Sequence, residues 1–517
     1  MLDNTILKTL SNISRVSLIL KTFSSYGFQE FILKLGLSKL VPNMVFSHPY
    51  KKLSAEKRLR MCFEKLGPAF IKLGQILAHR TDLLPLTFCQ ELAILHSQAE
   101  TLDFKTIEKV LINNYGTDYL KQFKEFSTTA IGSGSIAQTY KACMLDGLKV
   151  VVKIQKPKVK EIIKEDIKVL QILSKLIEKY IPEFKLYQPQ RLVEEFSRQL
   201  EMEMDFIVEA NNTKKLHLFF KDDKAVKIPN VYSKYSSDNI LILEEIKGTS
   251  FSQINSLNYQ QEQLTDILDK TLKAYLKMLF QRGLYHADLH SGNILYTEDN
   301  KIAFIDFGQV GRLNKREQMS ISHMLTALSE EDYERFAMEY LDLSHSGEAS
   351  LESFSSSLQN LIDPYYGVTL EGVKIGQIFM ETANLAFKHK IKVPIYLMIF
   401  FKSILSLEGT GRNISKNFNF IKSAQEFADQ FIKDGHEQNY WKSSLDFVLR
   451  DLNHLLLSSP RQLRSFFRKV GDPNFKWKLD IQNLDKVAKA VNRLALFILL
   501  GFIFLGLVVV FVNFKQI

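Results

Sequence analysis

Two histidines, an aspartate and an asparagine lie within the stretch HADLHSGN, from His286 to Asn293. Two histidines four residues apart share one face of a helix, a spacing that zinc can use. Gly292 within the stretch and the strand-like NILY after it indicate a loop instead. We therefore favour a loop-bracing role for His286 and a loop position beside Asp288 for His290 over zinc ligation by the two residues. Residues at fixed distances on either side must decide the chemistry.

The second group of reactive residues follows at a fixed distance. Asn293 stands five residues after Asp288, and Asp306 opens a D-F-G triplet 18 residues after Asp288. This order resembles H-R-D-L-x-x-x-N followed by D-F-G, with Ala287 in place of the arginine. Phosphoryl transfer mainly needs positioning and charge neutralisation. We predict that Asn293 and Asp306 hold Mg²⁺ through hard oxygen ligands, and that Asp288 orients or deprotonates the attacking hydroxyl or water.

Upstream residues could hold the phosphates of ATP. A Gly-rich turn without bulky side chains lets backbone N–H groups approach phosphate oxygens, and the turn expected to do so comprises Ile131, Gly132, Ser133, Gly134, Ser135, Ile136 and Ala137. A flexible hairpin turn is the alternative. Lys153 lies 21 residues after Gly132 in the apolar run VVVKIQ, and we predict that it grips the α- and β-phosphates. Its alternative is an edge strand with the ammonium reaching water.

A buried lysine needs a carboxylate partner, and the stretch EMEMDFIVEA offers Glu203, Asp205 and Glu209. A solvated acidic helix face is the alternative for these three residues.

The elements that must position these groups follow from periodicity. Residues 1 to about 120 have apolar positions at helical spacing, and β-rich runs follow at about 125–155 with a hairpin turn at Asp146-Gly147. Helical sequence to about 212 precedes two strands within IPNVYSKYSSDNILILEEIKG. From about 260 helices dominate, apart from the segment 284–310. We predict an α+β, bilobal, protein-kinase-like fold with a helical N-terminal extension (1–120), an N-lobe (121–248), a helical C-lobe (249–485) and a transmembrane helix (494–512).

The chain of 517 residues predicts two or three domains. Its net charge of +10 suits an acidic partner, but the basic residues are spread along the chain, so we expect no nucleic acid. The cysteines, Cys62, Cys89 and Cys143, have no paired spacing, which fits a reducing compartment and excludes a cysteine-based zinc module.

One segment breaks the soluble pattern. Residues 494–512 carry no charge over 19 positions and would span roughly 28 Å as a helix. We predict a transmembrane anchor, with the larger part of the chain cytoplasmic because Lys486, Lys489 and Arg493 precede it. The basic segment 460–473 is either a lipid-binding amphipathic helix or a solvated helix face. Residues 1–23 resemble an amphipathic helix rather than a secretory signal, although an organellar targeting peptide stays open.

The chain resembles the UbiB/AarF family of atypical, kinase-like ATPases tied to ubiquinone biosynthesis. The resemblance rests on LGPAFIKLGQILAHRTDLLP, which contains the family's KxGQ signature, and on SIAQTYKA, VVVKIQKP, EMDFIVEAN and HADLHSGNIL…IDFGQVGRL in the same order. It implies that Lys72 and Gln75 fold across the cleft where a protein substrate would lie. It also implies that Glu203 and Asp205 hold Lys72 or the metal, and that Glu209 is the partner of Lys153.

The resemblance also implies a function. Such a protein would be a membrane-anchored, Mg²⁺-dependent ATPase that helps extract or present polyprenylated precursors. Its cofactors would be ATP and Mg²⁺, and its partners anionic membrane lipids, polyprenyl-phenol quinone precursors, quinone biosynthetic enzymes and a second copy of the chain as a homodimer. The compartment would be a bacterial inner membrane, or the mitochondrial inner membrane if the protein is organellar.

Three departures and two alternatives remain. Family members of this type often end in two membrane segments, whereas this chain shows one clear span. Many family members have an alanine-rich nucleotide loop where this chain has GSGS, and Leu289 and Ser291 stand where prolines are common. The same residues would also suit a kinase for a small molecule or lipid, or an ATP-binding scaffold without catalysis. The absence of A-P-E after D-F-G argues against a conventional protein kinase.

Overall fold

The computed structural model describes residues 14–437 apart from short gaps at 38–39, 41–49, 51, 79, 81–83, 97–100, 182–183, 185–187, 257–258, 345–348, 366–374, 416–417 and 419. Within these residues, no helix is both long and apolar enough to cross a membrane. The predicted span 494–512 and the basic segment 460–473 lie outside the described residues, so both stay predictions.

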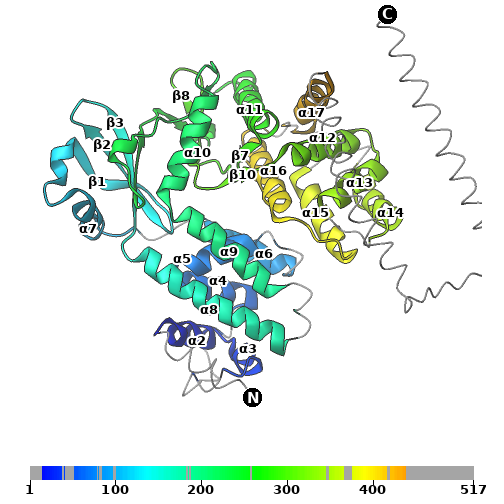
Figure 1. Ribbon diagram of the computed structural model, residues 1–517, viewed down its shortest axis with the longest axis horizontal. Coiled ribbons are helices and arrows are strands. Elements are labelled where there is room, and N and C mark those ends of the chain that lie inside the picture. The colour runs from blue at the N-terminus through cyan, green and yellow to red at the C-terminus, as the bar shows by residue number, and fades with distance from the viewer. Residues whose placement is uncertain are drawn as a thin grey trace, which may run out of the picture. The chain divides into compact units, whose positions relative to one another are not determined.

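The N-terminal helices share one hydrophobic core with two later helices (Figure 1). The helices are α2 (Ser14–Ser25), α3 (Gln29–Lys34), α4 (Ala55–Leu66), α5 (Pro68–Leu77), α6 (Leu86–Ala93), α8 (Val159–Tyr180) and α9 (Pro189–Glu203). Ser54 accepts the N–H of Lys57 and caps α4, and Pro68 starts α5 directly after Gly67. The predicted helical extension therefore packs against helices from the predicted N-lobe.

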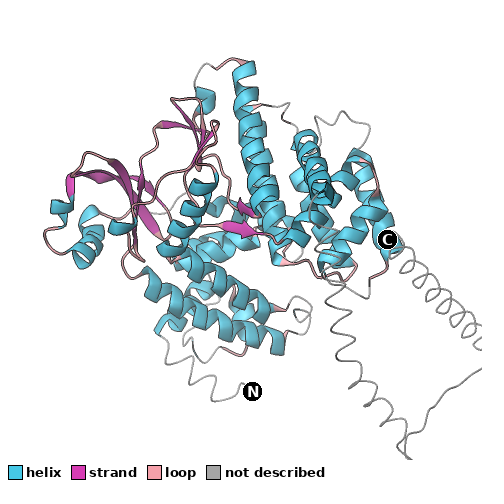
Figure 2. Cartoon of the chain, turned by 45° about the horizontal axis from the view of Figure 1, so that its top comes forward, coloured by secondary structure: helices cyan, strands magenta, loops and turns pink. Residues whose placement is uncertain are grey.

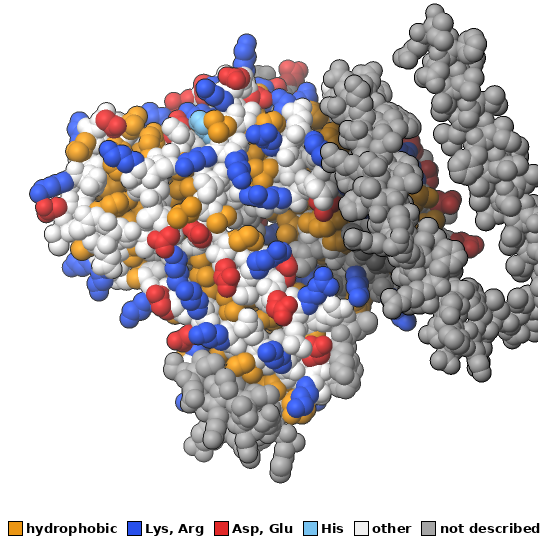
Figure 3. Space-filling model, viewed as in Figure 1, with side chains coloured by type: hydrophobic (Ala, Val, Ile, Leu, Met, Phe, Trp, Pro, Cys, Tyr) orange, Lys and Arg blue, Asp and Glu red, His pale blue; other side chains and the backbone are white. Residues whose placement is uncertain are grey.

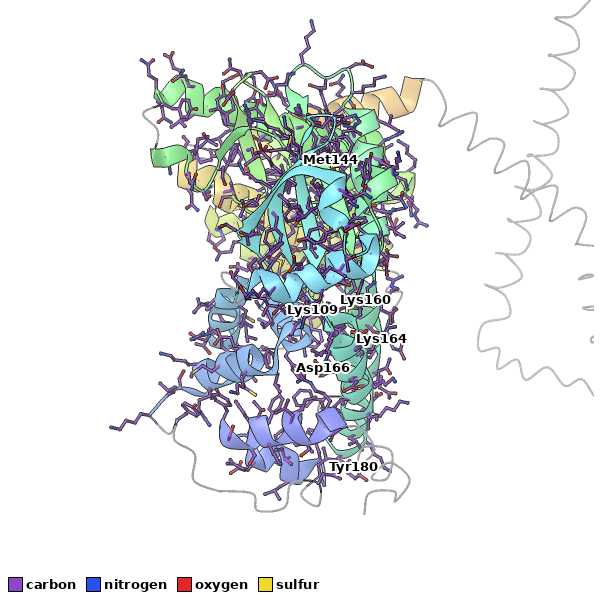
Figure 4. All side chains as sticks on the ribbon, turned by 90° about the vertical axis from the view of Figure 1, so that its left-hand side faces the viewer. Lys109, Met144, Lys160, Lys164, Asp166 and Tyr180 are labelled. Carbon is purple, nitrogen blue, oxygen red and sulfur yellow. The ribbon has the colours of Figure 1, made fainter. Side chains whose placement is uncertain are left out.

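The α2 helix is fixed to this core by a buried ion pair. Arg15 Nε lies 2.7 Å from Oδ1 of Asp166, whose side chain is fully buried on α8; Asp166 is labelled in Figure 4. Val16, Ile19 and Leu20 are buried beside it. The apolar face of residues 14–25 therefore packs on protein, and the amphipathic pattern reflects this packing.

A four-stranded antiparallel sheet follows in the order β1-β2-β3-β5. Its strands are β1 (Phe123–Ser133), β2 (Ala137–Met144), β3 (Lys149–Gln155) and β5 (Ile240–Glu244), and α7 (Phe104–Tyr115) packs against it. The predicted hairpin turn at Asp146-Gly147 is confirmed, because Gly147 adopts φ +86° between β2 and β3. The sequence predicts two strands within IPNVYSKYSSDNILILEEIKG. The second is β5, but the first is wrong, because the residues around Val231 form a single bridge, to Leu243.

The segment 284–310 and its neighbours form two small sheets, drawn in magenta in Figure 2. One has the order β4-β9-β8-β6 and the other pairs β10 with β7. The strands are β4 (Val226–Lys227), β6 (Gly248–Ser250), β7 (Leu284–His286), β8 (Ile294–Thr297), β9 (Ile302–Phe304) and β10 (Val310–Arg312). Their turns hold the HADLHSGN and D-F-G residues, as the interruption in the helical pattern predicts.

Apart from α10 (Phe206–Phe219), the remaining described helices share the largest core. They are α11 (Gln261–Leu276), its π-helical continuation (Lys277–Arg282), α12 (Lys315–Ser329), α13 (Tyr333–Ser344), α14 (Leu351–Ile362), α15 (Ile375–Lys388), α16 (Ile395–Ile414) and α17 (Phe420–Glu437). Short 3₁₀ turns lie at Ile94–His96, Tyr119–Gln122, Ser233–Tyr235, Ile254–Ser256 and Asp363–Tyr365. The mixture of helices and sheets confirms the predicted α+β class. In the view of Figure 3, basic and acidic side chains are interspersed over the described surface.

Candidate active site

Lys153 stands at the centre of the candidate site. It lies on β3, opposite Thr139 of β2 and Leu241 of β5, so β3 has a hydrogen-bonded strand on each side and the edge-strand alternative is wrong. Its Nζ lies 2.9 Å from both carboxylate oxygens of Glu209 and 3.3 Å from Oδ2 of Asp306. A lysine on a central strand thus joins two carboxylates that are distant in sequence.

Helix α10 (Phe206–Phe219) brings Glu209 to this lysine. The side chain of Asp205 accepts the N–H of Ile207 at 2.9 Å and caps the helix, and Glu209 follows in the first turn. The Glu209 side chain is only 4% exposed. Burial raises the pKa of Glu209 to about 7, although the charge of Lys153 opposes this shift. This pairing of Lys153 with Glu209 is the one that the resemblance implies.

Burial shifts the pKa values of Lys153 and Asp306 toward the neutral form of each group, but neighbouring charges shift them further in the opposite direction. Burial lowers the pKa of Lys153, but the carboxylates of Asp306 and Glu209 leave it above its ordinary value. Burial raises the pKa of Asp306, but Lys153 and the N–H of Gly308 bring it down to about 2. Both groups are therefore charged at neutral pH.

The D-F-G turn and Asn293 offer oxygen ligands for a cation. Asp306 Oδ1 accepts the N–H of Gly308 at 2.9 Å, while Phe307 is fully buried and fixes the turn. The Asn293 amide nitrogen donates to the carbonyl of Asp288 at 3.1 Å, so its oxygen is the atom that suits a metal ion. No group of three His, Cys, Asp or Glu side chains suited to a metal occurs in the described part of the chain. One carboxylate and one amide fit Mg²⁺, which takes its other ligands from phosphates and water.

Both histidines of the opening stretch brace the loop. His286 Nδ1 accepts the N–H of Asp288, and His290 Nδ1 accepts the N–H of Gly292, each at 3.1 Å. Burial lowers the pKa of His286 to about 4, so its ring is neutral at pH 7. The predicted bracing role of His286 is confirmed by this hydrogen bond.

The carboxylate of Asp288 has a partner that sequence reasoning missed. Lys402 Nζ, on α16, lies 3.2 Å from Asp288 Oδ1. Burial raises the pKa of Asp288, but Lys402 and then Lys72 lower it below its ordinary value. The available signal was a single lysine inside the apolar run LMIFFKSIL, where an unpaired ammonium would be costly.

Lys72 of the KxGQ segment also reaches the site. Its Nζ lies 2.5 Å from Oε1 of Glu203, and the Gln309 amide donates to Oε2 of Glu203 at 3.4 Å. Burial lowers the pKa of Lys72, but Glu203 and Asp288 leave it raised. Gln309, directly after D-F-G, is a second residue that the sequence reasoning missed.

Other residues of these motifs have positions set by packing. The Gln75 amide donates to the carbonyl of Leu95 at 3.1 Å. A Cβ at Gly74 would lie 2.3 Å from Leu95 Cδ1 and 2.8 Å from Phe63 Cδ2, so glycine permits the close contact of α5 with its neighbours. Asp205 is the cap of α10, as described above, and among the described residues the ion pair of Lys72 is with Glu203. The structure therefore pairs Lys72 with Glu203, whereas the described side-chain hydrogen bonds of Gln75 and Asp205 are to backbone groups of Leu95 and Ile207.

The Gly-rich turn has room on its surface. Gly132 and Ser133 continue β1, and the N–H of Gly134 donates to the carbonyl of Ala137 at 2.8 Å. A Cβ at Gly132 would meet nothing within 4 Å, and one at Gly134 would meet only the Ala137 oxygen at 3.7 Å. Neither glycine has positive φ, so the fold itself does not require glycine there. Ile131 and Ser135 belong to the same turn, but the Ile136 side chain is buried in the N-terminal helical core.

Two family models match the chain. The ABC1 atypical kinase-like domain matches residues 94–340, and the UbiB helical domain matches residues 358–419. The chain belongs to the UbiB/AarF family of atypical kinase-like proteins. Within this family, the first model covers Lys153, Glu209 and Asp306, whereas Lys402 lies in the second.

Named relatives span most of the chain. The probable protein kinase UbiB of Erwinia tasmaniensis is 28% identical over 81% of this chain and 79% of its own length. An uncharacterised protein from Clostridium pasteurianum, encoded 5′ of hydrogenase 1, is 32% identical over 94% and 89%. A solved structure of the Rv3197–erythromycin complex from Mycobacterium tuberculosis has a TM-score of 0.49 and 22% identity, covering 72% of this chain and 95% of that chain.

Proposed function

We propose that the protein is a membrane-anchored, Mg²⁺-dependent ATPase or atypical kinase that acts in ubiquinone biosynthesis. The observation that carries the catalytic part is the convergence of Lys153, Glu209 and Asp306, with Nζ–oxygen distances of 2.9 and 3.3 Å. A charged lysine on a central strand, oriented by a buried glutamate beside the D-F-G aspartate, is the arrangement that kinases use to hold nucleotide phosphates.

The residues divide the work by their chemistry. Lys153 would bind the α- and β-phosphates, and the open faces of Gly132 and Gly134 would let backbone N–H groups approach them. Asp306 and Asn293 would hold Mg²⁺, which neutralises charge on the phosphates. Asp288 would orient the attacking hydroxyl or water through a hydrogen bond. Its depressed pKa makes it a weak proton acceptor, which favours an orienting role.

The ion pair between Lys72 and Glu203 supports hydrolysis or a small substrate over a peptide substrate. It joins α5 to the end of α9 at 2.5 Å, and the side chains are 13% and 21% exposed. Gln309 links the same glutamate to the segment after D-F-G. In the family, the KxGQ element fills the place of a protein substrate, so this contact supports a closed site that excludes a polypeptide.

The test is ATP turnover by the full chain purified in detergent, with and without anionic liposomes. We expect Asp306→Asn to reduce turnover by at least about 10²-fold, as expected for the loss of an electrostatic contact in the transition state. Asp299→Asn is the matched control, because Asp299 is 58% exposed and pairs with Lys301 on the surface. Absence of turnover in the wild type, or equal turnover in Asp306→Asn, would contradict the proposal. Radiolabel passing from ATP into a lipid extract would identify a kinase rather than a hydrolase.

The quinone role and the membrane location rest on the family and on the span predicted at 494–512. The location would be an inner membrane, with the kinase-like part on the cytoplasmic side of a bacterial membrane or in mitochondria. Quinone profiling of a deletion strain tests the role: we expect an early polyprenyl-phenol precursor to accumulate. Unchanged quinones would contradict it.

A further inference from the structure

The aspartate loop has no permanent positive charge of its own. From His286 to Asn293 the sequence HADLHSGN contains no lysine or arginine. Phosphoryl transfer develops negative charge beside the group that orients the acceptor, and cations placed there stabilise it. Among the described residues, the lysine within ion-pair distance of Asp288 Oδ1 comes from another part of the chain: Lys402 Nζ lies 3.2 Å away.

Lys402 occupies a position where the helix alone would favour an apolar residue. Its neighbours Phe400, Phe401, Ser403 and Ile404 on α16 are at most 1% exposed, whereas the Lys402 side chain is 20% exposed. An ammonium in such surroundings is costly unless it is paired. Within the described part of the chain, Asp288 is the only carboxylate within ion-pair distance of Lys402.

The ion pair is not needed to dock α16 on the loop. Tyr285 Oη donates to the carbonyl of Tyr396 at 3.3 Å, and the Thr410 hydroxyl donates to the carbonyl of Leu289 at 3.4 Å. The Tyr275 and Ser403 hydroxyls are also hydrogen-bonded to each other. Figure 1 shows α16 beside β7 and β10. Because these contacts fix the helix on both sides of Lys402, a purely structural role for its charge is redundant.

The other two lysines of the site have different partners. Lys72 pairs with Glu203 at 2.5 Å, and Lys153 pairs with Glu209 and Asp306. An acceptor oxygen held by Asp288 would lie within about 3 Å of that carboxylate. Lys402 Nζ would then lie within about 6 Å of the acceptor oxygen, a distance that the flexible lysine side chain can close.

We propose that Lys402, supplied by the helical domain, binds the terminal phosphate of ATP and holds Asp288 toward the acceptor. The inference rests on the proposed ATP-dependent function. It means that the kinase-like domain does not form a complete site, because one phosphate-binding residue comes from the region that the second family model covers. An interaction with the terminal phosphate distinguishes ATP from ADP.

The experiment compares Lys402→Met and Lys402→Arg with the wild-type full chain in detergent. Affinities for Mg-ADP and for a Mg-bound, non-hydrolysable ATP analogue are measured by calorimetry, and ATP turnover is measured in parallel. We expect Lys402→Met to bind ADP within about twofold of wild type and to bind the analogue about 10- to 100-fold more weakly, the range for one hydrogen bond to a charged group. Its turnover should fall about 10²- to 10³-fold, with partial recovery in Lys402→Arg.

Lys273→Met is the matched control, because Lys273 is 53% exposed and pairs with Asp269 on the surface of α11. Equal affinity of Lys402→Met and wild type for the analogue would overturn the inference while leaving the proposed function intact. An equal loss of affinity for ADP and analogue would overturn it too, because that result indicates a structural role. A wild type that binds neither nucleotide would contradict the proposed function itself, and the inference would fail with it.

Discussion

Replacing Gly74 by alanine tests whether α5 packs as closely as the structure has it. The added Cβ would lie 2.3 Å from Leu95 Cδ1 and 2.8 Å from Phe63 Cδ2. Ordinary carbon contacts are about 3.5–4 Å, so both side chains must retreat by roughly 1 Å. Overpacking of this kind costs about 1–3 kcal/mol. Because Lys72 is on the same helix, a shift of α5 would also disturb its ion pair with Glu203.

Helix propensity acts in the opposite direction, and a second glycine measures it. Alanine is better than glycine in a helix by about 1 kcal/mol. Gly409 lies on α16, and beyond the adjoining backbone of that helix an added Cβ would meet nothing within 4 Å. We therefore expect Gly409→Ala to stabilise the protein by about 0.5–1 kcal/mol, and Gly74→Ala to be about 1–3 kcal/mol less stable than Gly409→Ala.

The assay is urea unfolding of the full chain in detergent, followed by far-UV circular dichroism. A double-mutant cycle with Leu95→Ala adds a stricter criterion, since removal of the Leu95 methyl groups should make room for the new Cβ. We expect a favourable coupling of about 1–2 kcal/mol between the two substitutions. Equal stabilisation by Gly74→Ala and Gly409→Ala, with additive effects of Leu95→Ala, would refute the packing argument.

Two further predictions concern buried ionisable groups. Arg15→Met leaves the fully buried carboxylate of Asp166 unpaired and should lower the free energy of unfolding by about 3–5 kcal/mol. Adding Asp166→Asn should recover part of this loss. An unchanged unfolding midpoint in Arg15→Met would argue against a stabilising role of the ion pair. Burial lowers the pKa of His286 from 6.5 to about 4. Between these pH values the unfolded chain binds a proton at this residue and the folded chain does not. The free energy of unfolding therefore falls as pH decreases from 6.5 to 4, by up to about 3 kcal/mol. His286→Asn should flatten this slope in unfolding curves measured from pH 7 to pH 4, and a slope identical to wild type would contradict the assignment.

The residues that sequence reasoning located are those whose role depends on spacing along the chain. Lys153, Asn293 and Asp306 each stand on or beside a strand or turn that the local pattern predicts. The pairing of β8 with β9 places Asn293 near Asp306, whereas Lys153 lies on β3 in another sheet and reaches Asp306 through its side chain. Glu209 and Glu203 are carboxylate candidates from the stretch EMEMDFIVEA, and the family resemblance assigns Glu209 to Lys153. Helices α10 and α9 bring them to Lys153 and Lys72. The chemical roles assigned to these residues stay predictions.

The residues that it missed depend on packing between distant elements. Lys402 reaches Asp288 only because α16 lies beside β7 and β10, and no local pattern gives that arrangement. Asp205 belongs to the same motif as Glu203, but it caps α10 by accepting the N–H of Ile207. Gln75 belongs to the same motif as Lys72, but its amide donates to the carbonyl of Leu95. The strand predicted near Val231 is reduced to one bridge because the 3₁₀ turn at Ser233–Tyr235 follows at once.

The most direct test of the central claim is an experimental structure of the full chain with Mg²⁺ and a non-hydrolysable ATP analogue. We predict phosphates between the Gly132–Gly134 turn and Asp306, with Lys153 Nζ in contact with the α- or β-phosphate and the metal bound by oxygens of Asp306 and Asn293. A nucleotide bound elsewhere, or one bound with Lys153 and Asp306 both out of contact with it and its metal, would contradict the account.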